Sequence, residues 1–134
     1  MQETAHDQTA RPPERAEEPS DISRWLAALA YAFVAAPFVI YEARRRPPDE
    51  YLRFHARQGF VLFFVEFVIL VASMILEAAI GKLGFLGSVL MATWKLCWGL
   101  GAVGVSVMGF MYALSGERWN LPVLGKYSHR VPLK

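Results

Sequence analysis

The chain has 134 residues, of which 54% are hydrophobic and 19% charged, with a mean hydropathy of +0.28 and a net charge of +2. Its apolar residues form runs too long for a soluble domain of this size, in which each helix keeps a polar face toward water. The Lys and Arg residues lie beside these runs, where basic residues anchor membrane segments, so we expect no binding of nucleic acid. Cys97 is the only cysteine, which leaves no partner for an internal disulfide bond.

Residues 1–21 are acidic, with six Asp or Glu against two Arg, and they contain three prolines. No valine, leucine or isoleucine occurs in the first 20 positions, so folding this segment would bury little apolar surface to offset its loss of entropy. We predict a disordered acidic tail over residues 1–21.

The first apolar run covers residues 22–41, and its 20 residues at about 1.5 Å each match the roughly 30 Å of a bilayer's hydrocarbon core. Ser20 or Asp21 is the expected N-cap. Pro37 lacks a backbone N–H and should kink or loosen the helix near its exit. We therefore predict that residues 22–41 are the first of three transmembrane helices.

An arginine-rich turn with two prolines precedes the second helix. Asp49 is the expected N-cap of that helix, with Glu50 in its first turn, where a negative charge complements the helix dipole. We expect the helix to begin before it reaches lipid and to span the membrane over residues 59–80.

Three glycines within residues 81–87 predict the next turn. The third span should run from about Val89 or Ala92 to Leu114, giving an expected membrane segment over residues 92–114. The predicted fold is therefore all-α: a three-helix transmembrane domain over residues 22–127, followed by a C-terminal tail, 128–134, along the lipid headgroups.

Basic residues set the expected orientation. With three spans, the arginine-rich turn shares its side of the membrane with the C-terminal tail, and these two segments carry most of the Lys and Arg. Basic residues are retained in the cytoplasm, so we predict an external N-terminus and a cytoplasmic C-terminus.

The polar residues of the second helix fall on one stripe when placed at 100° per residue. Because polar groups facing lipid are costly, this stripe should face other helices or a wet cavity. Glu66 is the deepest ionisable group, and two roles are open for it: a hydrogen bond that fixes helix packing, or conduction of ions or polar segments. Lys95 of the third span should reach the same membrane face as Glu77, where the two could pair or separately contact headgroups. The stripe and its candidate partner comprise His55, Gln58, Glu66, Ser73, Glu77 and Lys95.

Small residues form a groove along the third span and fit the small-xxx-small pattern of closely approaching helices. The groove could serve packing within the chain or self-association. Its residues are Ala102, Ser106, Gly109 and Ala113.

The sequence contains no Cys pair, no His-x-x-x-His and no Glu-x-x-His, so neither His55 nor His129 is expected to bind a metal. A Ser-His-Asp set, a glycine-rich phosphate loop and a nucleophile elbow are also absent from the sequence. We expect no cofactor and no enzymatic activity.

Two segments together carry a family resemblance: Tyr51-Leu-Arg-Phe-His-Ala-Arg-Gln-Gly-Phe60 and Gly116-Glu-Arg-Trp-Asn-Leu-Pro-Val-Leu-Gly125. The combination resembles a family of small bacterial membrane proteins that includes the magnetosome proteins MamF and MmsF, and is distantly similar to the Tic-type channel subunit of chloroplast protein import. The resemblance covers about residues 22–127. The family-defining positions that it carries over are Phe54, His55, Gln58, Asn120, Leu121 and Pro122.

The resemblance implies a membrane protein of three or four helices without catalytic residues, in a bacterial inner membrane or one derived from it. We expect a structural or assembly component that self-associates or binds other membrane proteins, with magnetosome-type membrane organisation or control of crystal growth as the implied process. The alternative is a translocon-like or channel-like subunit that uses the polar stripe of the second helix.

Overall fold

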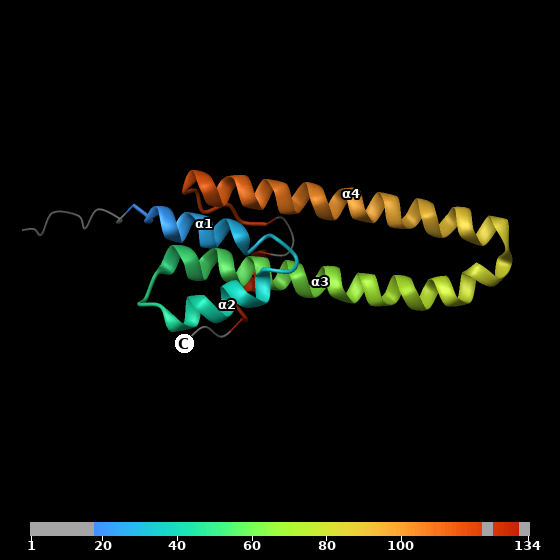
Figure 1. Ribbon diagram of the computed structural model, residues 1–134, viewed down its shortest axis with the longest axis horizontal. Helices are drawn as coiled ribbons and strands as arrows, with labels where there is room; N and C mark the ends of the chain where they lie inside the picture. The colour runs from blue at the N-terminus through green and yellow to red at the C-terminus, as the bar shows by residue number, and fades with distance from the viewer. Residues whose placement is uncertain (1–17, 122–124, 132–134) are drawn as a thin grey trace, which may run out of the picture.

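The computed structural model describes residues 18–121 and 125–131, and these residues are folded into helices without a β-strand. Most of the predicted acidic tail, and residues 122–124 and 132–134, lie outside the described residues. Figure 1 shows the arrangement. In chain order the elements are α1 Asp21–Leu29, α2 Ala36–Arg45, α3 Glu50–Ile80, the 3-10 turn η1 Gly81–Leu83, α4 Phe85–Ser115 and α5 Gly125–Ser128.

The two longest helices, α3 and α4, have 31 residues each and form an antiparallel hairpin (Figure 1). Both are long and apolar enough to cross a membrane. The start of α3 agrees with the sequence prediction, because the Asp49 carboxylate accepts a hydrogen bond from the Leu52 backbone N–H at 3.0 Å. The predicted second helix is therefore present and begins well before its apolar segment.

The turn between α3 and α4 is shorter than the glycines predict. Gly84 adopts a positive φ of 70°, and α4 begins at the next residue, Phe85, several positions before the predicted start of the third span. Gly87 lies inside α4, where a β-carbon would overlap the Ile80 carbonyl. This glycine thus allows a close crossing of two helix ends and does not extend the turn.

The prediction of one transmembrane helix over residues 22–41 is wrong. This segment forms two helices, α1 of nine residues and α2 of ten, separated by turns over residues 30–35. Pro37 lies in the first turn of α2, where its missing N–H leaves no helical hydrogen bond unmade. Each helix is only about 14–15 Å long, so neither is long enough by itself to cross a bilayer.

Helices α1 and α2 double back on each other and form a short helical hairpin against the large one (Figure 1). α1 packs on both α3 and α4, whereas α2 packs on α3. The apolar core of the molecule lies here, and it includes Ala27, Ala28, Tyr31, Val39, Ala43, Leu52, Ala56 and Ala113.

The short hairpin brings three parts of the chain to one end of the molecule, which we call the broad end: the start of α1, the α2–α3 turn and the end of α4 (Figure 1). The Ser23 hydroxyl donates a hydrogen bond to the Asp49 carboxylate, and Gly116 lies beside the Arg24 guanidinium. The start of α1 therefore lies beside the α2–α3 turn, at the same end of the molecule. η1 marks the other, narrow end.

Candidate functional site

A buried polar network joins the tip of the α1–α2 hairpin to α3. The Tyr31 hydroxyl lies 2.9 Å from His55 Nδ1 and 3.2 Å from Gln58 Oε1. The His55 and Gln58 side chains are completely buried, and Tyr31 is 2% exposed. Because an unbonded polar group at this depth would be costly, these contacts fix the position of the hairpin tip.

The same two α3 side chains hold the segment that follows α4. His55 Nε2 lies 3.1 Å from the Glu117 carbonyl, and Gln58 Nε2 donates to Asn120 Oδ1 at 3.1 Å. The Leu121 N–H points to Gln58 Oε1 at 3.4 Å. The two segments that carry the family resemblance therefore bind each other, although about 62 residues separate them along the chain.

The hydrogen-bond partners assign the tautomer of His55. A backbone carbonyl only accepts hydrogen bonds, so His55 Nε2 carries the proton that Glu117 receives. His55 Nδ1 in the neutral ring is then an acceptor, as is Gln58 Oε1, so both accept from the one Tyr31 hydroxyl proton, which they share. Gln58 Oε1 accepts from Leu121, and its amide nitrogen donates to Asn120. The polar atoms of His55 and Gln58 are thus bonded to other groups of the protein, and the network holds three parts of the chain together.

Backbone geometry after α4 brings the second segment into place. Gly116 has a φ of 83°, in the left-handed region that favours glycine, and it ends α4. The Glu117 N–H then donates to the Tyr112 carbonyl at 3.1 Å. The chain turns back along the bundle, and the Trp119 ring stacks on Tyr112 with centroids 5.0 Å apart.

Two glycines hold the end of α1 between α3 and α4. A β-carbon on Gly59 of α3 would overlap the backbone carbonyl of Ala30, and one on Gly109 of α4 would overlap the Tyr31 ring. Both positions require glycine, because only a residue without a side chain lets Ala30 and Tyr31 come this close to the two helices. The segment that follows α1 therefore packs closely against α3 on one side and α4 on the other.

Not every position singled out by the resemblance belongs to this network. Leu121 is 3% exposed and packs in the core, while its backbone bonds Gln58. Phe54 instead lines a surface pocket with several arginines. Pro122 lies outside the described residues.

The polar stripe of α3 continues toward the narrow end. Glu66 and Ser73 are 6% and 4% exposed, so this part of the stripe faces α4, as the helical periodicity predicts. The Ser106 hydroxyl lies 3.5 Å from Glu66 Oε1, and the Trp94 indole donates to the Ser73 hydroxyl at 2.9 Å. Further along, Lys95 Nζ lies 2.7 Å from Glu77 Oε2, which is the pairing that helix direction allowed.

The small-residue groove of α4 serves packing within the chain. Gly109 contacts Tyr31, Ala113 is fully buried, and Ser106 faces Glu66. The Ala113 carbonyl also accepts a hydrogen bond from the Tyr51 hydroxyl. Ala102 is half-buried at the margin of this contact. Gly109 and Ala113 are therefore covered within the chain, whereas Ala102 and Ser106 are only partly buried.

Sequence reasoning missed Tyr31, whose hydroxyl contacts both His55 and Gln58 and so links the α1–α2 hairpin to α3. One signal was available: Tyr31 is the only side chain with a hydrogen-bonding group between Leu26 and Phe38. Sequence reasoning also assigned Arg53, Arg57 and Arg118 only to membrane anchoring, whereas the structure places them around one pocket.

Comparison with known proteins adds no relative: no protein-family model matches the chain, and no curated protein and no solved structure matches it either.

Proposed function

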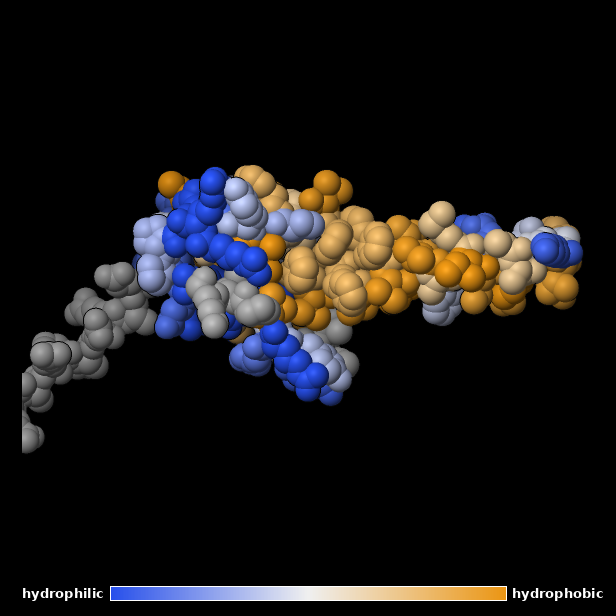
Figure 2. Space-filling model, turned by 90° about the horizontal axis from the view of Figure 1, so that it is seen from below, coloured by the Kyte–Doolittle hydropathy of each residue, from blue (hydrophilic) through white to orange (hydrophobic). Residues whose placement is uncertain are grey.

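We propose that the protein is a non-enzymatic integral membrane protein in which α3 and α4 cross the bilayer. The support is the surface of these helices beyond the short hairpin, which is a continuous apolar band (Figure 2). Large side chains such as Phe64, Met74 and Leu100 are 57–67% exposed there. In water this band would far exceed the apolar patches of ordinary monomers, whereas hydrocarbon solvates it.

The short α1–α2 hairpin enters the membrane from the broad end and returns to it in this arrangement. Nine of the basic residues within the described parts of the chain belong to the segments at the broad end, and only Lys82 and Lys95 lie toward the narrow end. Retention of positive charge then makes the broad end cytoplasmic. Both ends of the described chain face the cytoplasm, which replaces the expectation of an external N-terminus.

The role within the membrane is structural, and the protein self-associates through the outer face of α4, defined as Cys97, Gly101, Gly104 and Met108. These four positions lie within about 40° of one direction on the helix. Each is exposed, and a β-carbon on either glycine would meet nothing within 4 Å. This open strip carries the proposal, because it lets a second copy bring its backbone close without displacing any side chain.

The family resemblance extends the proposal to organisation of a bacterial inner membrane, or a membrane derived from it, including magnetosome-type organisation or control of crystal growth. Its support is the direct bonding of the two resembling segments through His55 and Gln58. Other membrane proteins are alternative partners for the outer face of α4.

The competing channel-like role has less support within one chain. Glu66 and Ser73 are bonded to α4, which favours a packing role for the polar stripe over conduction.

Oxidative crosslinking through Cys97 tests self-association. The full chain in lipid nanodiscs or vesicles, treated with copper phenanthroline, should form a disulfide-linked dimer. Adding bulk to the outer face of α4 through Gly101→Leu and Gly104→Leu should prevent the dimer, because leucine holds the two backbones apart. Val103→Leu, on another face of α4, is the matched control and should crosslink normally.

Crosslinking also reports random collisions, so the oligomeric state needs a second measurement. Light scattering in mild detergent should give a defined oligomer for the unaltered chain and a monomer for the double-leucine variant. A strictly monomeric unaltered chain in both detergent and bilayers would overturn the structural proposal.

A further inference from the structure

The outer face of α2 carries two aromatic rings and a cation that the rest of the fold leaves uncovered. The inner face, which includes Val39 and Ala43, is buried where α2 packs on α3. At 100° per residue, Phe38, Tyr41 and Arg45 fall within about 60° of one another on the opposite side of the helix. Phe38 and Tyr41 are 57% and 50% exposed, and Arg45 is exposed as well. These three residues form a stripe that is free to contact something outside the chain.

The stripe has a direction relative to the two ends of the molecule. α2 runs from the tip of the short hairpin to the broad end (Figure 1), so Phe38 lies nearer the tip and Arg45 nearer the broad end. The two residues are seven positions apart, which is about 10 Å along the helix axis. From the tip outward the order is an apolar ring, a tyrosine and a cation. A bilayer leaflet presents the matching order, from hydrocarbon through the interface to the charged headgroups.

Arg45 is held in position without being neutralised. Its guanidinium lies 4.8 Å from the centroid of the Tyr41 ring, in a cation–π contact. No ion pair joins Arg45 to a carboxylate within the described parts of the chain. The next residue, Arg46, differs in this respect, because it pairs with Glu42 at 3.6 Å. A guanidinium placed over a ring keeps N–H groups at its edge that can bond an oxyanion.

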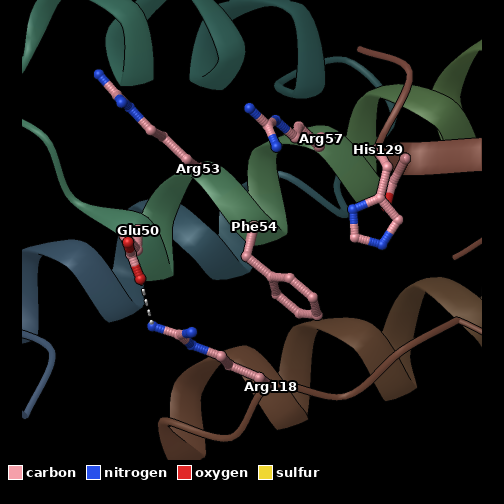
Figure 3. A pocket seen from close by; sticks show the side chains of 7 residues that line it. Glu50, Arg53, Phe54, Arg57, Arg118 and His129 are labelled. Atoms are coloured by element: carbon pink, nitrogen blue, oxygen red, sulfur yellow. Dashed lines mark ion pairs between the residues drawn. The ribbon is translucent and has the colours of Figure 1, made fainter. Parts of the chain in front are cut away.

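The other arginines of the broad end point in different directions. Arg53 and Arg57 of α3 line the same surface pocket as Arg118, but their guanidinium groups extend away from Arg118 (Figure 3). They therefore do not converge on one small ligand. Basic groups that are spread over several sides of the broad end suit a layer of anionic headgroups around the protein better than a single soluble anion.

We propose that the outer face of α2 is a binding site for one anionic phospholipid of the surrounding leaflet. Arg45 bonds the headgroup phosphate, Tyr41 lies at the level of the interface, and an acyl chain packs on Phe38. Charge complementarity selects an anionic headgroup, because a zwitterionic lipid brings a cation of its own close to Arg45. This inference rests on the proposed placement of α3 and α4 across the bilayer, and it is independent of self-association through α4.

The test uses the full chain in maltoside micelles at about 0.15 M salt, which screens long-range attraction. Native mass spectrometry follows the dissociation constant of the first bound lipid as phosphatidylglycerol is titrated, with phosphatidylcholine as the zwitterionic comparison. The site variant is Arg45→Gln. Its matched control is Arg46→Gln, which removes the same charge one residue further on, from an arginine already paired with Glu42.

Phosphatidylglycerol should bind more tightly than phosphatidylcholine. Arg45→Gln should weaken its binding about tenfold, and Arg46→Gln less than about twofold, because only the first variant loses the charge-assisted bond to phosphate. Equal affinity for the two lipids, or equal weakening in the two variants, would overturn the proposal.

A second pair of variants tests the stacked ring. Tyr41→Phe should bind phosphatidylglycerol as the unaltered chain does, because the ring still positions the guanidinium. Tyr41→Leu should weaken binding about twofold to fivefold through loss of the cation–π contact. Both side chains of the stack are exposed, so all these variants should keep the helix content of the unaltered chain by circular dichroism. Full binding by Tyr41→Leu would contradict the role of the ring.

A separate measurement distinguishes failure of the lipid site from failure of the membrane placement. The unaltered chain and Arg45→Gln should both stay with phosphatidylcholine vesicles after an alkaline carbonate wash, because α3 and α4 hold them there. A chain that stays with the vesicles but does not prefer phosphatidylglycerol would overturn the lipid site alone. A chain released by the wash would overturn the membrane placement and the lipid site together.

Discussion

The Tyr31 ring lies directly over the α-carbon of Gly109, so close that any β-carbon on the glycine would overlap it. On the other side of the same turn, Ala30 meets Gly59 in the same way. The tip of the short hairpin is therefore positioned by two helices that are far apart in sequence, and its hydroxyl is then bonded by His55. Several measurable consequences arise from this packing and from the surfaces around it.

Replacing Gly59 by alanine should destabilise the fold by about 1–3 kcal/mol, because the new methyl group must displace the Ala30 backbone. Thermal or denaturant unfolding in detergent, followed by circular dichroism, measures the change. Gly99→Ala is the matched control: its β-carbon meets nothing within 4 Å, and the substitution should leave stability unchanged or raise it by about 0.5–1 kcal/mol. Equal effects of the two substitutions would contradict the close approach.

Replacing Gln58 by leucine should release the segment that follows α4. The Leu121 N–H and the Asn120 side chain would each lose a partner, at a cost of about 1–3 kcal/mol for a buried group. Limited proteolysis should then cut faster within residues 117–121, and hydrogen exchange at the Leu121 amide should accelerate. Ser88→Ala removes only an exposed hydrogen bond at the other end of the molecule and should change neither rate.

The Glu77–Lys95 pair should contribute modestly in detergent. Both side chains are about half exposed, so a double-mutant cycle with Glu77→Gln and Lys95→Gln should give a coupling of about 0.2–1 kcal/mol. Raising the salt concentration should reduce this coupling, because the pair is open to solvent. A coupling that is absent at low salt would show that the two groups do not interact.

Single cysteines should report which ends of the fold share a membrane face. In a Cys97→Ser background, Glu18→Cys and Arg130→Cys should react alike with an impermeant maleimide, whereas Lys82→Cys should react only from the opposite face. All three positions are exposed. Opposite labelling of Glu18→Cys and Arg130→Cys would instead restore a third crossing of the membrane.

Short stretches of sequence correctly predicted where α3 begins and which of its residues face α4. Asp49 followed by a long apolar run identified the start of α3, and helical periodicity placed Glu66 and Ser73 on its inner side. The hairpin over residues 21–45 has no comparable local signal, because Ala30–Ala36 contains no glycine and reads as a continuous apolar span. Pro37 was interpreted as a kink, whereas it occupies the first turn of a new helix.

The buried network depends on pairs that a single sequence does not reveal. Tyr31 and His55 are 24 positions apart, and Gln58 and Asn120 are 62 apart. Sequence analysis singled out His55, Gln58 and Asn120 through a resemblance, without predicting that they touch. The surface pocket has the same origin: Arg53 and Arg57 are neighbours on α3, but Arg118 comes to line the same pocket only through the turn at Gly116.

The short hairpin also gives the molecule unequal girth, with α1 and α2 flanking the long pair at one end and only α3 and α4 at the other (Figure 1). Embedded in a bilayer, such a tapered body displaces more lipid from the leaflet around its thick end. That leaflet must expand relative to the opposite leaflet, and the bilayer then curves so that it is convex on the side of the thick end. If the proposed membrane placement holds, many copies in one patch would add these small wedges together, and the packing of Tyr31 would then favour one direction of membrane bending.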